Sequence, residues 1–164
     1  AMVSKRLSRL EGHRRKFLVV IDGTPECERA VHYAGRRAKN SNGALVLLYV
    51  IPEGDFQQWL GVEQIMRAEA REEAEASLAK VAQKVRENVG LEPEAVIREG
   101  SAAEQIHGLI EEDRDIAILV LASGSTKEGP GPLVSSIAGR GTAFPIPVTV
   151  LPDSLTDEEI DALC

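Results

Sequence analysis

The chain has 164 residues, of which 43% are hydrophobic and 27% charged, a composition typical of one globular domain with a sizeable core. Its net charge of −7 argues against nucleic acids and anionic membranes as partners. No apolar stretch approaches the length of a membrane span. Two cysteines, Cys27 and Cys164, make no disulfide framework, so we expect a protein of the reducing cytoplasm.

Residues 1–15 form a basic arm rich in Lys and Arg. We expect a solvated, partly frayed tail, with contact to an acidic partner as the alternative. The apolar run that follows, Phe17–Ile21, is stopped by Asp22 and is too short for the hydrophobic region of a signal peptide. Its continuous, β-branched character predicts a strand covered on both faces.

The segment 22–26 predicts a turn, a helix cap and a proline at the first helical position. The helix that follows closes at 40–43, and its apolar face holds Cys27, Ala30, Val31, Ala34 and Ala38. This position favours core packing of the Cys27 thiol over reactivity. Ala44–Ile51 is a second buried strand, which Pro52 ends.

A long helix is predicted from about Gly61 to Val89. Its apolar positions recur every three or four residues, at Val62, Met66, Ala70, Ala74, Leu78, Val81, Val85 and Val89. A short third strand, Glu94–Arg98, precedes a helix that a capping box formed by Ser101 and Glu104 would open. Ile106, Leu109 and Ile110 would point inward from that helix.

The fourth strand is predicted at Ile116–Leu121 and the fifth at Val148–Leu151, with a Gly/Ser/Pro loop and a short helix near 136–142 between them. A cap signal at Thr156 predicts one or two helical turns in the tail. Strands that alternate with helices indicate a mostly parallel sheet. Ligands bind such sheets at the carboxyl ends of the strands, where small residues and a helix start admit phosphate.

Five segments, in this order and spacing, resemble the universal stress proteins over about residues 16–152: FLVVIDGTPECERAVHYA, LVLLYVI, REGSAAEQI, ILVLASGS and IPVTVLP. The resemblance implies a three-layer α/β/α fold with a five-stranded parallel sheet in the order 3-2-1-4-5, like that of the adenine nucleotide alpha hydrolases. It implies a homodimer that pairs through the fifth strand. The acidic tail, residues 153–164, is the alternative cover for that edge.

One branch of this family binds ATP through the pattern G-x2-G-x9-G-[S/T]. In this chain the spacing falls on Ala122, Ser125, Ser135 and Ser136, so only the last hydroxyl satisfies it. The added Cβ atoms crowd a phosphate and resist positive φ angles. Serine hydroxyls, however, are donors that can hold an anion.

The resemblance also implies that Asp22 and Val50 lie on the adenosine side of such a site. Asp22 serves equally well as a cap carboxylate, and Val50 as a buried strand valine. The candidate cofactor-binding residues are therefore Asp22, Val50, Ala122, Ser123, Ser125, Ser135, Ser136 and Ile137.

The sequence carries no catalytic constellation and no metal-ligand spacing among its histidines, so an enzyme is disfavoured. Two hypotheses remain. The first is a non-enzymatic stress-response protein with a degenerate nucleotide pocket. The second is a protein that binds ATP or AMP, with slow ATP hydrolysis, in which serines replace the glycine contacts. No cofactor is certain; ATP and AMP are the candidates.

Overall fold

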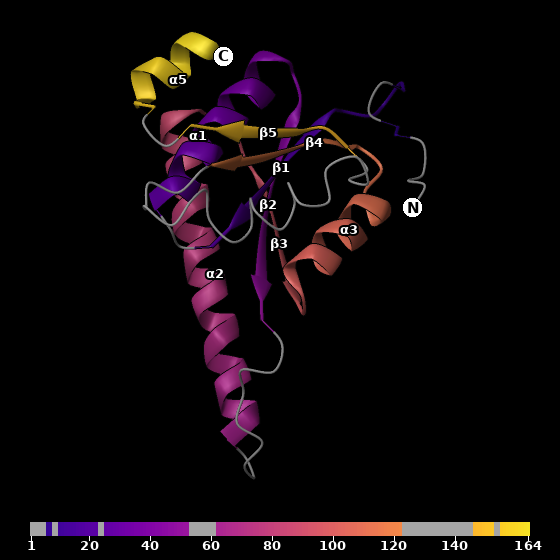
Figure 1. Cartoon of the computed structure of the whole chain (residues 1–164), viewed down its shortest axis with the longest axis vertical. Coiled ribbons are helices and arrows are strands. Elements are labelled where there is room, and N and C mark those ends of the chain that lie inside the picture. Colours follow the sequence, from indigo (N-terminus) through magenta and orange to yellow (C-terminus); the bar gives the residue numbers. More distant parts are fainter. Residues whose placement is uncertain (1–5, 8–9, 23–24, 53–61, 123–145, 153–154) are drawn as a thin grey trace.

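The computed structural model describes residues 6–7, 10–22, 25–52, 62–122, 146–152 and 155–164 (Figure 1). Its elements in chain order are β1 (Lys16–Ile21), α1 (Pro25–Asn40), β2 (Ala44–Ile51), α2 (Val62–Asn88), β3 (Glu94–Glu99), α3 (Ala102–Glu112), β4 (Ile116–Ala122), β5 (Val148–Leu151) and α5 (Asp157–Leu163). The strand predictions agree with these bounds to within one residue at each end. The helix expected near 136–142 lies outside the described residues.

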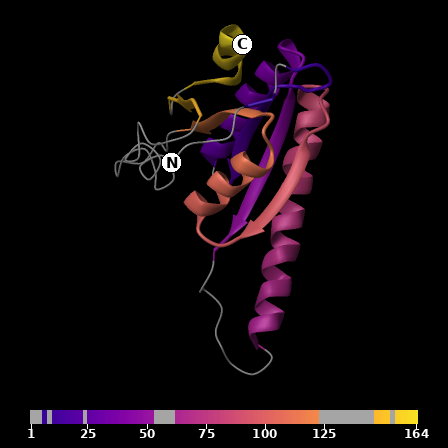
Figure 2. The same ribbon diagram turned by 90° about the vertical axis from the view of Figure 1, so that its right-hand side faces the viewer.

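The five strands form one sheet in the order β3-β2-β1-β4-β5, and every neighbouring pair is parallel. The predicted sheet order is therefore confirmed. Helices cover both faces: α1 and α2 lie on one side and α3 on the other (Figure 2). This alternation of strand and helix across a parallel sheet buries the continuous apolar runs that the sequence shows.

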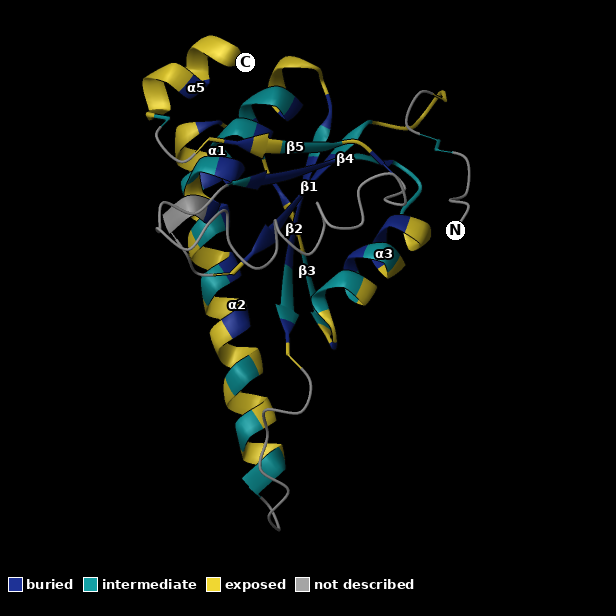
Figure 3. Cartoon of the chain, in the orientation of Figure 1, coloured by how far each residue is buried: buried dark blue, intermediate teal, exposed yellow. Residues whose placement is uncertain are grey.

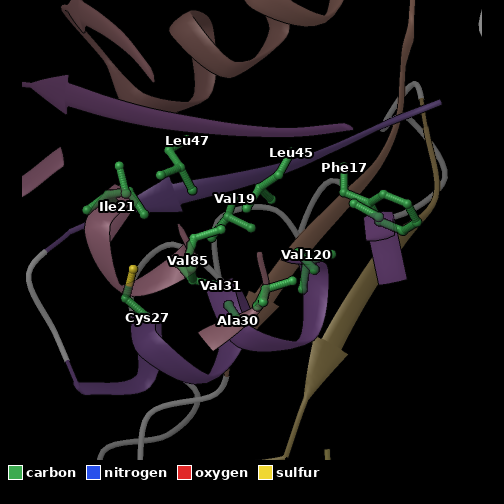
Figure 4. Packing of buried hydrophobic residues seen from close by; sticks show 14 of the residues in the cluster. Phe17, Val19, Ile21, Cys27, Ala30, Val31, Leu45, Leu47, Val85 and Val120 are labelled. Carbon is green, nitrogen blue, oxygen red and sulfur yellow. The ribbon is translucent and has the colours of Figure 1, made fainter. Parts of the chain in front are cut away.

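Side chains of β1 alternate between two cores. Phe17 and Val19 pack with α1 and α2, in the cluster of Figure 4, whereas Leu18 packs with α3. The predicted apolar face of α1 is buried as expected, at Cys27, Ala30, Val31, Ala34 and Ala38. Burial of one large apolar side chain stabilises the fold by about 1.5–3 kcal/mol, so these two layers are its main support.

Helix α2 is much longer than the strands that it covers. From Ala74 onward it packs on the sheet, through Ala74, Leu78, Ala82 and Val85, while its first turns extend beyond the carboxyl ends of the strands (Figures 1 and 3). Ala82 was not part of the predicted stripe. The helix ends at Asn88, and the chain turns through Gly90, whose φ of 76° suits glycine.

The two predicted helix caps have different outcomes. Ser101 occupies the N-cap position of α3, but its side chain makes no capping hydrogen bond, so the predicted capping box is wrong. Only the backbone carbonyl of Ser101 takes part, by accepting the N–H of Gln105 at 2.9 Å. Thr156 does cap α5, because its Oγ1 accepts the backbone N–H of Glu159 at 3.2 Å.

Part of the described N-terminal arm is docked: Arg6 and Leu7 are half-buried, whereas residues 10–14 are exposed, as a solvated tail would be. The Arg6 guanidinium donates to the carbonyl of Ile110 at 2.6 Å, and the Leu7 N–H donates to the carbonyl of Arg114 at 2.9 Å. The last carbonyls of a helix lack partners within the helix. Arg6 supplies a donor at the end of α3, which anchors the arm there.

The C-terminal helix α5 packs on α1, and its Ile160 is fully buried. Asp161 accepts hydrogen bonds from His32 at 2.7 Å and from Arg36 at 3.0 Å, and both donors lie on α1. The described tail thus lies along α1, which does not support its alternative role as a cover for the β5 edge. No helix of the described residues is long and apolar enough to cross a membrane.

Candidate functional site

The order of the sheet reverses between β1 and β4. From β1 the chain proceeds to β2 on one side, whereas β5, which follows β4, lies on the other side. Ligands of open parallel sheets bind at such a switch point, outside the carboxyl ends of the strands. Asp22 directly follows β1, and Ala122 is the last residue of β4. Because Val19 pairs with Val120, the same register brings Ile21 level with Ala122.

Three of the candidate binding residues are described, and they lie on adjacent strands. Asp22 is exposed at the end of β1. Val50 of β2 pairs with Arg98 of β3 and packs on the α3 side of the sheet. Ala122 of β4 packs on the side of α1 and α2. Val50 and Ala122 therefore face opposite sides of the sheet. The remaining candidates lie outside the described residues: Ser123, Ser125, Ser135, Ser136 and Ile137.

Tyr49 is a residue of this edge that the sequence reasoning missed. It pairs with Ile21 and packs on the side of α1 and α2. Burial raises the pKa of the Tyr49 hydroxyl, and the carboxylates of Glu73 and Asp22 raise it further. The hydroxyl therefore stays protonated at neutral pH and remains a hydrogen-bond donor. The register of β1 and β2 was the signal that could have identified it. Two parallel strands that end at the same edge bring Tyr49 beside Ile21.

The arginines described at this edge are already paired with carboxylates. Arg67 of α2 lies 3.1 Å from Glu63 and 3.5 Å from Glu99, the last residue of β3. Arg98 pairs with Glu112 at 2.7 Å. These two arginines are outnumbered by the five carboxylates named here, Glu63, Glu99, Glu112, Asp22 and Glu73, so the named groups together carry a net negative charge.

A hollow lies away from this edge of the sheet. It measures about 680 Å³ and lies between α1, the second half of α2 and the start of α5. Its rim is mixed in sign, with Arg29, Glu87 and Asp157, and Lys84 is paired with Glu28 at 2.7 Å. Because both signs of charge are present, these groups favour no particular class of ligand. The candidate site is therefore identified by the strand topology and not by this groove. In the described part of the chain, no three His, Cys, Asp or Glu side chains are grouped to hold a metal ion.

The model of the universal stress protein family matches residues 13–152. The chain belongs to the universal stress protein family. A comparison with curated protein sequences gave no match.

Three solved structures of universal stress proteins show a similar fold. UspA from Lactobacillus plantarum is 18% identical to this chain, with a TM-score of 0.69. The match covers 84% of this chain and 97% of that chain. A protein from Arabidopsis thaliana with AMP bound is 19% identical, with a TM-score of 0.60, and the match covers 88% of this chain and 94% of that chain. A protein from Archaeoglobus fulgidus in complex with dAMP is 16% identical, with a TM-score of 0.55, and the match covers 83% of this chain and 96% of that chain. At these identities the similarity establishes the fold alone.

Proposed function

We propose that this universal stress protein is a non-enzymatic binding and regulatory module of the stress response whose adenine-nucleotide pocket is degenerate. The pocket lies at the carboxyl ends of β1 and β4. The observation that carries the proposal is the position of Ala122: it ends β4 at the switch point of the sheet, where the glycine pattern of the ATP-binding branch would begin.

The two structural neighbours with AMP and dAMP support an adenine nucleotide as the ligand class. The replaced glycines support weak binding of ATP, because a Cβ at Ala122, Ser125 and Ser135 crowds the close approach of phosphate to the backbone. Ser123, Ser136 and Ile137 complete the proposed contacts, with Asp22 and Val50 toward the adenosine. Neither cysteine is in a disulfide, which fits the proposed cytoplasmic location.

The first prediction concerns the replaced glycines. A variant with Ala122→Gly, Ser125→Gly and Ser135→Gly should bind ATP–Mg²⁺ more tightly than the unmodified protein in calorimetric titrations, because three Cβ atoms are removed. Circular dichroism of both proteins checks that the fold is kept. Micromolar affinity in the unmodified protein would favour the second hypothesis, an ATP-binding protein with slow hydrolysis, which a phosphate-release assay would then test.

The second prediction concerns a homodimer, which is part of the same proposal. β5 is at the end of the strand order and its Val150 is 43% exposed, so the strand offers unpaired backbone groups and an apolar side chain to a second copy across a two-fold axis. Val150→Lys should give a monomer in light scattering at micromolar concentration, whereas Ile65→Lys, also on an exposed side chain, should stay dimeric. A monomeric unmodified protein would count against the dimer.

A further inference from the structure

A short acidic helix, α5, lies along one side of α1. His32, Arg36 and Asn40 recur every four residues, so they share that side of α1, which we call the docking face. Asp161 accepts hydrogen bonds from His32 at 2.7 Å and from Arg36 at 3.0 Å. The Asn40 amide donates to the carbonyl of Cys164 at 3.5 Å. The docking face therefore holds α5 through polar groups spread over about two helical turns.

The composition of α5 shows which chemistry the docking face recognises. Four of its seven residues are acidic and none is basic. Ile160 is fully buried, whereas Leu163 is 59% exposed, so one aliphatic side chain anchors the helix. Arg36 supplies a permanent positive charge opposite these acids. The docking face is thus suited to an acidic amphipathic helix that carries an aliphatic anchor.

The hollow of about 680 Å³ gives the docking face more room than α5 uses. It borders Thr156 and Asp157 at the start of α5 and continues between α1 and α2. Val31 and Val85 are among its lining residues, and Arg29 lies at its rim. The rim selects no small molecule, but a helix one turn longer than α5 at its N-terminal end would reach this apolar lining and gain contact area there.

We propose that the docking face and this hollow form a binding site for a partner protein, which enters with an acidic amphipathic helix, and that α5 fills part of the site until the partner displaces it. The occupant is argued from charge complementarity and from the way α5 itself binds. A tethered helix competes at an effective concentration on the order of millimolar, so the partner needs the added contacts in the hollow. The site lies apart from the proposed nucleotide pocket, and its test uses no nucleotide.

The probe is a fluorescein-labelled synthetic peptide of residues 155–164, titrated with the full-length protein and followed by fluorescence anisotropy. Ile160→Ala in the protein releases α5, so this variant should bind the peptide about tenfold more tightly than the unmodified protein, whose own α5 competes. Arg36→Ala added to that variant should weaken binding several-fold. Arg71→Ala is the matched control, because Arg71 pairs with Glu75 of its own helix at 3.6 Å, away from the docking face.

Two further comparisons guard against a folding defect and against nonspecific binding. Asp161→Asn in the protein removes the ionic contacts of α5 without removing apolar surface, so it should also increase peptide binding. In the peptide, Ile160→Ala should weaken binding about tenfold because the anchor is lost, and Leu163→Ala should leave it unchanged because that side chain is mostly in solvent.

Each outcome supports or overturns the proposal. Peptide binding that needs release of α5, Arg36 and the isoleucine anchor supports it. If the peptide binds neither release variant, α5 is held only by its tether and the proposal is overturned. Equal binding to the unmodified and released proteins would place the peptide elsewhere and would also overturn it. Oligomers larger than a dimer that Ile160→Ala disperses would make a second copy the occupant and overturn the assignment to a partner protein.

Discussion

Asp161 fastens the C-terminal helix through a single carboxylate oxygen, which accepts from the imidazole of His32 and the guanidinium of Arg36. The hydrogen bond from Arg36, and then that from His32, holds the pKa of Asp161 below its usual range. A carboxyl group with a lowered pKa stabilises the docked form above its ordinary pKa. That contribution is lost as the pH falls through the lowered value.

Acid should therefore release α5 before it unfolds the sheet. In amide hydrogen exchange, α5 of the unmodified protein should stay protected at neutral pH and lose protection below about pH 4, the ordinary pKa of an aspartate. Asp161→Asn should weaken protection at neutral pH and remove this acid dependence. Glu158→Gln, at an exposed position of the same helix, is the control. An unchanged pH profile in Asp161→Asn would show that the carboxylate does not hold the helix.

At the scale of elements, α5 is a short helix that needs tertiary packing. It has seven residues, too few for a stable helix in isolation, so its order depends on contact with α1. Ile160 is fully buried in that contact, whereas Leu163 is 59% exposed. The family match ends at residue 152, so this contact belongs to a segment beyond the matched domain.

Ile160→Ala should undock α5, because loss of a fully buried isoleucine costs about 2–5 kcal/mol. Hydrogen exchange should show α5 unprotected while β1 and β4 keep their protection, and the main urea transition should move little. Leu163→Ala should leave protection of α5 almost unchanged, because its side chain is mostly in solvent. Equal loss of protection in the two variants would contradict the packing role of Ile160.

Over the whole molecule, local sequence patterns predicted the elements well and the long-range contacts poorly. Apolar runs gave the strands, and their order along the chain placed Asp22 and Ala122 at one edge of the sheet. Contacts between distant segments have no local pattern: His32 and Asp161 lie 129 positions apart.

The central claim is that an adenine nucleotide binds at the carboxyl ends of β1 and β4. Backbone amide shifts in an NMR titration with AMP test this most directly, because they report where the ligand lies even when binding is weak. The account predicts that the largest shifts fall at Asp22, Tyr49 and Ala122, which lie at or near the carboxyl ends of β1, β2 and β4. Shifts centred on His32 and Lys84, in the groove between α1 and α2, or no shifts at all, would contradict it.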